Sequence, residues 1–188
     1  VFTDDETGET VIAGMGELHL EIYVERIRRE YKVDVEVGAP KVSYRESATK
    51  EATYDFTHKK QTGGSGQYAC IVGTMGPMTD EEVETTEGEL LFNDKIRGGR
   101  IPANFIPAIE KGFRNMLAKG PVAGYPVVGI KIDLIDGKFH DVDSSDMAFQ
   151  VAGSMAFKKA VLDARPILLE PVMKLEVRVP EEYVGAVM

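Results

Sequence analysis

The apolar residues between Tyr125 and Ala164 change from the spacing of a strand to the spacing of a helix. Apolar side chains alternate with others over 126–135, which is typical of a strand. From Met147 onward, small and apolar side chains recur at helical intervals, which predicts a helix over 145–164. A strand followed directly by such a helix restricts the chain to folds in which helices pack against a sheet.

The connection between these two elements, residues 136–146, is polar and contains His140. Functional side chains are common at connections of this kind. Asp143, Ser144 or Ser145 would make a good N-cap for the helix that follows. The segment therefore has two interpretations, a site that uses His140 or a solvated turn whose acids cap a helix.

A second informative segment, residues 58–68, is a glycine-rich loop between two strand-like runs. Its glycines permit positive φ angles and close approach of the backbone to another molecule. A basic, glycine-rich loop is typical of phosphate binding, and equally of a mobile hairpin. It is not a Walker A loop, because no Gly-Lys-Ser/Thr follows. It is not a dinucleotide fingerprint either, because strand-like sequence follows where a helix would be needed.

Residues 1–38 combine a hairpin, a helix and a strand. Gly8 lies at the predicted turn, an amphipathic helix covers 16–31, and valines alternate with acids over 33–37. This order predicts part of a ferredoxin-like unit that lacks its first strand and helix, so we expect the chain to begin within that domain. The segment Gly38 to Pro40 interrupts the pattern and predicts a domain boundary.

Residues 41–172 predict an α+β domain in which two helices cover one sheet. The acidic segment 79–89 is expected to have low order. Residues 173–188 begin with alternating apolar side chains, which predicts the first strand of another domain. The elements expected between 41 and 172 are strands at 42–48, 52–57, 68–75, 89–92 and 126–135 and helices at 106–119 and 145–164.

Composition and charge exclude several classes of protein. The net charge is −9, but Lys and Arg outnumber acids over 93–120. A basic face on an acidic body suits docking on a phosphate-rich surface, the alternative being an ordinary solvated face of mixed charge.

The single cysteine, Cys70, excludes an internal disulfide and is expected to be buried. Apolar runs fall short of the roughly 20 residues that a membrane span needs, and the acidic start predicts no signal peptide.

The residues around His140 do not predict catalysis or metal binding. The acids between Asp141 and Asp146 have the spacing of the start of a calcium loop, but its glycine and its final glutamate are missing. An exposed tip offers a general base neither an orienting partner nor a substrate pocket. GTP hydrolysis would need a phosphate-binding loop and magnesium ligands, which this chain lacks. We therefore expect no catalytic residue, no metal and no cofactor in this chain.

Five segments, in order along the chain, resemble the C-terminal half of the elongation factor G family of translational GTPases. They are Gly14–Glu21, Lys60–Tyr68, Gly120–Val127, His140–Asp146 and Leu169–Met173. The resemblance covers essentially the whole chain. It implies the end of domain III over 1–38, domain IV over 41–172 and the first strand and turn of domain V, another ferredoxin-like fold, over 173–188. Domain IV would be a ribosomal-protein-like α+β fold with a left-handed βαβ crossover.

By this resemblance, the chain is the ribosome-binding arm of a factor that promotes tRNA–mRNA translocation during elongation. Domain IV would reach the decoding region of the small subunit, with the loops 58–67 and 136–143 at its tip. The full-length factor would be a monomer that uses GTP and Mg²⁺ outside this chain, in the cytoplasm or in a mitochondrial or plastid matrix. The residues assigned to the RNA- and tRNA-contacting tip are His140, Asp141, Lys59, Lys60, Gln61, Gly63, Gly64, Ser65, Gly66 and Gln67.

Two tip positions qualify what the resemblance implies. Ser65 stands where many relatives carry Arg, so no arginine–phosphate contact is implied there. His140 matches a histidine that is modified in the eukaryotic and archaeal counterpart, and we expect it unmodified because the flanking sequence is of the bacterial or organellar kind. The alternatives are a ribosome-recycling or ribosomal-protection relative with the same architecture, and a free-standing phosphate-binding α+β enzyme.

Overall fold

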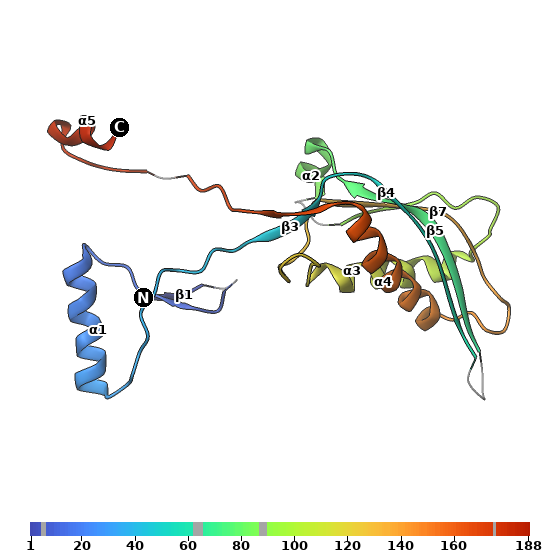
Figure 1. Cartoon of the computed structure of the whole chain (residues 1–188), viewed down its shortest axis with the longest axis horizontal. Helices are drawn as coiled ribbons and strands as arrows, with labels where there is room; N and C mark the ends of the chain where they lie inside the picture. The colour runs from blue at the N-terminus through green and yellow to red at the C-terminus, as the bar shows by residue number, and fades with distance from the viewer. Residues whose placement is uncertain (5–6, 62–65, 87–89, 175) are drawn as a thin grey trace. The chain divides into compact units, whose positions relative to one another are not determined.

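The computed structural model describes residues 1–4, 7–61, 66–86, 90–174 and 176–188. Its internal contacts divide the chain into two units, which are described separately (Figure 1). One unit is continuous, Tyr44–Leu169, and the other combines Val1–Ser43 with Glu170–Met188.

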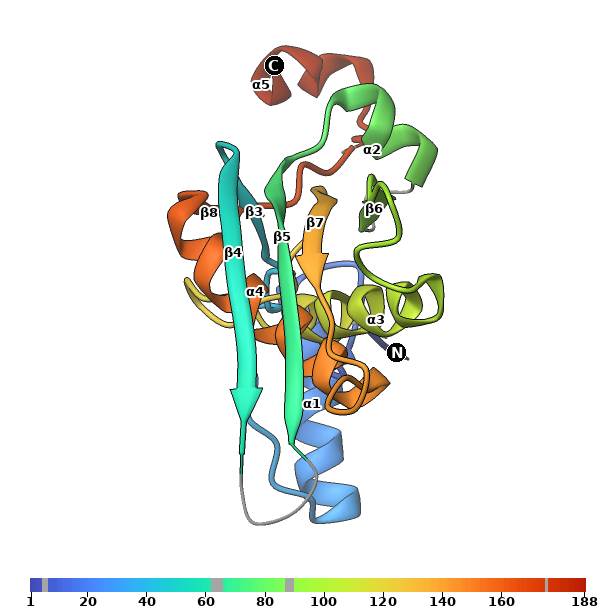
Figure 2. The same ribbon diagram turned by 90° about the vertical axis from the view of Figure 1, so that its right-hand side faces the viewer.

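A four-stranded sheet forms the centre of the continuous unit (Figure 2). The strand order is β4-β5-β7-β6, in which β6 runs parallel to β7 and the other neighbours are antiparallel. The parallel pair is joined through α3 (Ile106–Leu117), as a βαβ crossover requires. The strands are β4 (Ala52–Lys60), β5 (Gln67–Pro77), β6 (Leu91–Asp94) and β7 (Ile130–Lys138).

Alternation along the central strands directs one row of apolar side chains into the core. Ile130, Ile132 and Leu134 of β7 are fully buried there, together with Ile71 and Met75 of β5. Helices α3 and α4 (Asp146–Asp163) cover this face of the sheet (Figure 2). The predicted α+β architecture, with helices on one face of a sheet, is therefore confirmed.

The helices α3 and α4 pack against each other at glycines. A Cβ atom built on Gly153 would lie 2.7 Å from the carbonyl oxygen of Ile109, closer than real side chains come. Beside it, the Ser154 hydroxyl donates to the carbonyl oxygen of Gly112 at 2.9 Å. Any larger side chain at Gly153 would push the two helices apart and loosen the core.

The first and last strands of the continuous unit form a separate two-stranded ribbon. Strand β3 (Arg45–Ala48) pairs antiparallel with β8 (Pro166–Leu169), and Arg45 lies opposite Leu169. The alternating sequence predicted a strand over 42–48, but it did not predict β8. A four-residue strand directly after a helix is too short to show a period of its own.

Glu46 of the ribbon holds the loop that follows α3. Its side chain is fully buried, and a Cβ atom on Gly120 would collide with its carboxylate. Burial by itself would raise the pKa of the Glu46 carboxyl, but backbone N–H donors outweigh burial and lower this pKa below its ordinary value. The donors are Val122 at 2.9 Å, Ala123 at 2.8 Å, Gly124 at 2.9 Å and Tyr125 at 3.1 Å.

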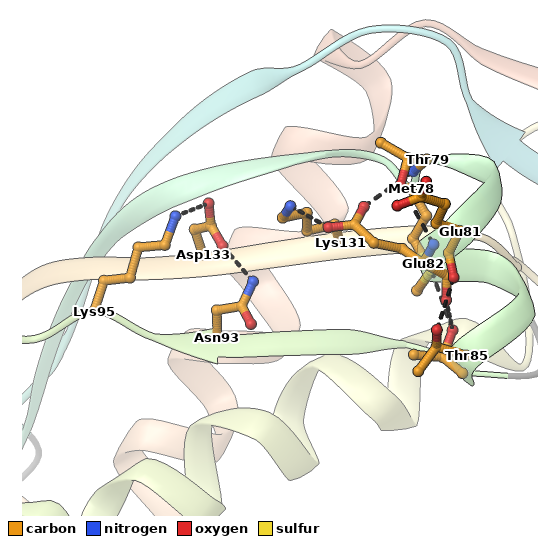
Figure 3. A network of polar contacts seen from close by, with 10 residues as sticks. Met78, Thr79, Glu81, Glu82, Thr85, Asn93, Lys95, Lys131 and Asp133 are labelled. Atoms are coloured by element: carbon orange, nitrogen blue, oxygen red, sulfur yellow. Dashed lines mark hydrogen bonds and ion pairs between the residues drawn. The ribbon is translucent and has the colours of Figure 1, made fainter.

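The face of the sheet away from α3 and α4 carries a polar network (Figure 3). Asp133 is 8% exposed, and its carboxylate accepts from the Lys95 ammonium at 2.6 Å and from the Asn93 amide at 2.8 Å. Burial alone would raise the pKa of Asp133, but these two donors outweigh it and lower the pKa. The Tyr54 hydroxyl donates to the Asp133 carbonyl oxygen at 3.1 Å from within the core. The network therefore ties β4, β6 and β7 together.

The expectation of low order over 79–89 is wrong for the residues that the structure describes. Helix α2 (Asp80–Thr86) forms there, and residues 87–89 lie outside the described part of the chain. Thr79 and Glu82 explain the helix. The Glu82 N–H donates to the Thr79 hydroxyl at 3.3 Å, and the Thr79 N–H donates to the Glu82 carboxylate at 2.9 Å, which is a capping box. Glu82 also pairs with Lys131 of β7, which fixes the helix to the sheet.

The second unit contains the expected hairpin and helix. Strands β1 (Phe2–Thr3) and β2 (Thr10–Val11) pair antiparallel, and Gly8 has the positive φ of 67° that the turn needs. Helix α1 (Glu17–Tyr31) follows, with only Val24 buried. The predicted apolar stripe is thus largely exposed, and Leu18 for example is 70% exposed.

Two strands expected in the second unit are absent among its described residues. Residues 33–37 and the described part of 173–179 form no strand, although their apolar side chains alternate. Alternation fits a strand, but a strand also needs a neighbour to hydrogen-bond with, and no described residue pairs with either segment. After 179 the chain turns into η2 (Glu181–Tyr183) and the short α5 (Val184–Val187).

Candidate nucleic-acid interface

The start of β5, next to the glycine-rich loop, is hydrogen-bonded at one end of the sheet to the loop that follows β7, far away in the sequence. The Tyr68 N–H at the start of β5 donates to the Asp143 carbonyl oxygen at 2.9 Å. The Ser144 hydroxyl donates to the Tyr68 carbonyl oxygen at 2.7 Å, across 76 residues of sequence. Both polar groups of the Tyr68 backbone are therefore bonded to the loop that follows β7.

The loop after β7 is held in shape by its own serines. The Ser144 hydroxyl, besides donating to Tyr68, accepts the His140 N–H at 2.9 Å. The Ser145 hydroxyl accepts the Ala148 N–H at 3.2 Å and caps α4. The N-cap is thus Ser145, whereas Ser144 joins the two loops. The helix-capping interpretation therefore accounts for Ser145 but not for His140.

The His140 side chain is 55% exposed and has one ring nitrogen turned toward its own loop. Its Nδ1 accepts the N–H groups of Val142 at 3.3 Å and Asp143 at 3.2 Å. A nitrogen that accepts hydrogen bonds carries no proton, so the neutral ring has its proton on Nε2. The Nε2–H group is then the donor that His140 can offer to another molecule.

The hairpin approaches the loop closely at Gly66. A Cβ atom there would lie 2.8 Å from the Asp143 carboxylate, so a larger residue would require the Asp143 side chain to move. Gly66 therefore lets the Asp143 side chain lie directly against the hairpin. This is a different role from the backbone contact with RNA that the resemblance implies for it.

Polar side chains are exposed at the end of the hairpin and in the loop after β7. Lys59, Lys60, Gln61 and Asp141 are exposed, and Gln67 is half-buried. The His58 Nε2 atom lies 2.8 Å from the Gln67 side-chain oxygen, so Gln67 is already engaged within the hairpin. The remaining predicted tip residues, Gly63, Gly64 and Ser65, lie outside the described residues.

The basic segment 93–120 is partly neutralised by ion pairs. Lys95 pairs with Asp133, Arg100 with Asp136 at 2.6 Å, and Arg114 with Glu110 at 2.8 Å. The segment is therefore less of a continuous basic face than its composition predicts. Cys70 is buried in β5, as expected.

Within the described ranges, no three His, Cys, Asp or Glu side chains are grouped so that they could hold a metal ion. None of the helices described here is long and apolar enough to cross a membrane. The arrangement at the tip offers cationic, amide and imidazole donors. Such donors can bind the phosphate and sugar groups of RNA without reading its sequence.

The sequence pattern did not predict the hydrogen bonds between Tyr68 and the loop after β7. The sequence pattern places Tyr68 only at the start of a strand and Ser144 only as a possible cap. The signal for their contact lies in the resemblance, because both residues belong to the segments that carry it. A pattern with a period of a few residues cannot report a contact across 76 positions.

Comparison with known proteins gives two family matches. The family described as "Elongation factor G, domain IV" matches residues 40–165, and the family described as "Elongation Factor G, domain III" matches residues 1–39. A crystal structure of a protein from Thermus thermophilus superposes with a TM-score of 0.71 at 43% identity, covering 89% of this chain and 24% of that one.

Curated relatives carry the same family name. Elongation factor G of Rhodopirellula baltica is 59% identical over 187 residues, which is 100% of this chain and 26% of that protein. Elongation factor G 2 of Bdellovibrio bacteriovorus is 54% identical, and elongation factor G 1 of Syntrophus aciditrophicus is 56% identical. The chain thus spans about a quarter of the length of these relatives.

Proposed function

The chain belongs to the elongation factor G family, and from this premise we propose that it is the ribosome-binding arm of a translation factor. In this proposal the factor promotes movement of the tRNA–mRNA duplex through the ribosome during elongation. The continuous unit enters the decoding region of the small subunit. The hydrogen-bonded tip loops then prevent the tRNA from moving back.

The observation that carries the proposal is the link between Tyr68 and Ser144, which presents both candidate loops on one end of the sheet. The Lys59, Lys60 and Gln61 side chains from one loop and the His140 Nε2–H group from the other can then contact one stretch of RNA. Contacts to phosphate and sugar carry no sequence information. Such contacts suit a factor that must act on every codon.

Other parts of the proposal concern the full-length factor. GTP and Mg²⁺ bind in a part of the factor outside these residues, and hydrolysis there sets the timing of the movement. This chain supplies binding and mechanical support but no catalytic group. The factor acts as a monomer in the cytoplasm, and its partners are the small ribosomal subunit, tRNA and mRNA.

The His140→Ala variant of the full-length factor tests this proposal. Translocation, measured by rapid kinetics of tRNA movement, should slow substantially while GTP hydrolysis stays near that of the wild type. The free energy of unfolding should fall by no more than about 1.5 kcal/mol, because the Val142 and Asp143 N–H groups lose Nδ1 as their acceptor in an exposed loop. Normal translocation together with a clearly lowered melting temperature would support a purely structural turn and refute the proposal.

A second variant, Lys59→Ala with Lys60→Ala, tests the charge at the tip. Loss of two phosphate contacts should weaken ribosome binding and reduce its dependence on salt concentration. Lys158→Ala with Lys159→Ala on α4 is the matched control, because it removes the same charge from exposed positions away from the tip. Equal effects of the two double variants would mean that only net charge matters.

A further inference from the structure

A shallow depression of about 580 Å³ lies beside the tip loops. It is lined by Tyr68, Arg100, Gly137, Lys138, Phe139 and His140. Apart from His140, none of these residues belongs to the tip described above as contacting RNA.

The lining combines cations and aromatic rings and contains no acidic residue. Arg100 and Lys138 are exposed, and Phe139 is 38% exposed. Tyr68 is half-buried, with its ring centroid 6.4 Å from that of His140. Aromatic rings beside Lys and Arg are typical of sites for single-stranded nucleic acid, in which bases stack and phosphates pair with the cations.

The position of Arg100 is fixed by its neighbours in the sequence. Gly98 and Gly99 have φ angles of 70° and 66°, and this left-handed turn leads the chain into Arg100. Ile101, the next residue, is 2% exposed and anchors the segment in the core. The Arg100 guanidinium then pairs through Nη1 with Asp136 at 2.6 Å. This pair engages only some of the five N–H donors of a guanidinium.

Gly137 allows the end of β7 to pack closely against the core beneath the depression. A Cβ atom there would collide with the Cys70 carbonyl oxygen and with the Ile101 side chain. The chain therefore has no side chain at this point, and the next two residues, Lys138 and Phe139, are exposed. Three segments of the chain thus meet here in a defined arrangement: the start of β5, the turn before Ile101, and the end of β7.

We propose that this depression binds one unpaired RNA nucleotide. Its base stacks on Phe139, the more exposed of the two rings, and its phosphate pairs with Lys138 and Arg100. The inference rests on the proposed function, to which it adds a stacking contact beside the phosphate contacts of the tip loops. Stacking tolerates any base, because every base has a π face. The nucleotide would lie next to His140 and would place the neighbouring RNA against the tip.

Nuclear magnetic resonance titration of the 188-residue chain tests the proposal. The probes are an adenosine pentanucleotide and an abasic pentanucleotide of the same length and charge. The adenosine probe should shift the ring signals of Tyr68 and Phe139 and bind at least about fivefold more tightly than the abasic one, since stacking of one base has about this effect or more. Equal affinity of the two probes, or no ring shifts at millimolar concentration, would overturn the proposal.

Substitutions identify the groups involved. Phe139→Leu should remove most of the preference for the adenosine probe, and Phe139→Tyr should retain it. Lys138→Gln should weaken binding of both probes and reduce the slope of log affinity against log salt by about one. Lys158→Gln is the control for charge, and an equal effect of the two lysine variants would refute a specific phosphate contact.

Failure of this inference can be distinguished from failure of the proposed function. The translocation assay with His140→Ala in the full-length factor does not depend on stacking in the depression. If the two probes bind equally and His140→Ala slows translocation, the nucleotide site is refuted and the ribosome-binding role stands. Fast translocation by that variant would remove the role itself.

Discussion

The buried carboxylate of Glu46 accepts the backbone N–H of Val122 at 2.9 Å. Its other oxygen accepts three further N–H groups from the same loop, including that of Gly124 at 2.9 Å. The main chain of Glu46 bonds to this segment as well, since its N–H donates to the Pro126 carbonyl oxygen at 2.8 Å. One residue of β3 therefore fixes the course of the chain from α3 to β7.

We expect Glu46→Gln to destabilise the continuous unit. The glutamine oxygen can replace one carboxylate oxygen, but its NH₂ group would face an N–H donor and leave that donor unpaired. An unsatisfied buried donor costs about 1–3 kcal/mol, measurable as a lower midpoint in urea denaturation. Glu51→Gln at an exposed position is the control and should change stability by less than about 0.5 kcal/mol. Equal stability of the two variants would contradict a structural role for the carboxylate.

The same carboxylate should make stability depend on acid pH. Its pKa in the folded chain lies below the unfolded value of about 4.3. The stabilisation is therefore complete above the unfolded pKa and is lost as the pH falls through the folded pKa. Urea titrations from neutral pH down to about pH 3 should show the wild type losing its advantage over Glu46→Gln below the unfolded pKa. A difference between the two proteins that stays constant with pH would contradict this.

We expect Ser144→Ala to uncouple the two tip loops without unfolding the domain. The Tyr68 carbonyl oxygen and the His140 N–H would both lose their partner, at a cost of about 0.5–1.5 kcal/mol. The Tyr68 amide should exchange its hydrogen faster, and translocation by the full-length factor should slow. Ser145→Ala is the matched control, because loss of a helix cap costs a similar amount but leaves Tyr68 bonded. Faster exchange of the Tyr68 amide in both variants would mean that the hairpin responds to stability alone.

Hydrogen exchange should separate the two units of the isolated chain. Amides in β5, β7 and α4 should be the most protected, because these elements carry the buried core. The hairpin β1–β2 and helix α1 bury little apolar surface and should exchange much faster. Slow exchange throughout 1–16, equal to that of β5, would contradict this prediction.

Elements in which the apolar pattern repeats over many residues could be predicted from the sequence. Short elements, and those that depend on a partner elsewhere in the fold, could not. The recurring small side chains of 145–164 predicted α4, whose Ala152, Ala156 and Ala160 are fully buried. Helix α2 was missed because its acids suggested a solvated segment. The pair Thr79 and Glu82, three residues apart, was the available signal.

The expected strand over 33–37 shows the opposite error. Its valines alternate as in a strand, but alternation reports only which side chains could share a face, whereas a strand also needs a partner. Glu46 was missed for a related reason: one glutamate in a strand-like run has no pattern that marks it as buried. The candidate tip was found through its residue types, but the contact between its two loops depends on tertiary structure.

The ribbon of β3 and β8 has a mechanical consequence for the continuous unit. Because Arg45 lies opposite Leu169, the chain arrives and leaves at adjacent points. A force that pulls these two points apart would therefore break the ladder one residue pair at a time, beginning at Arg45.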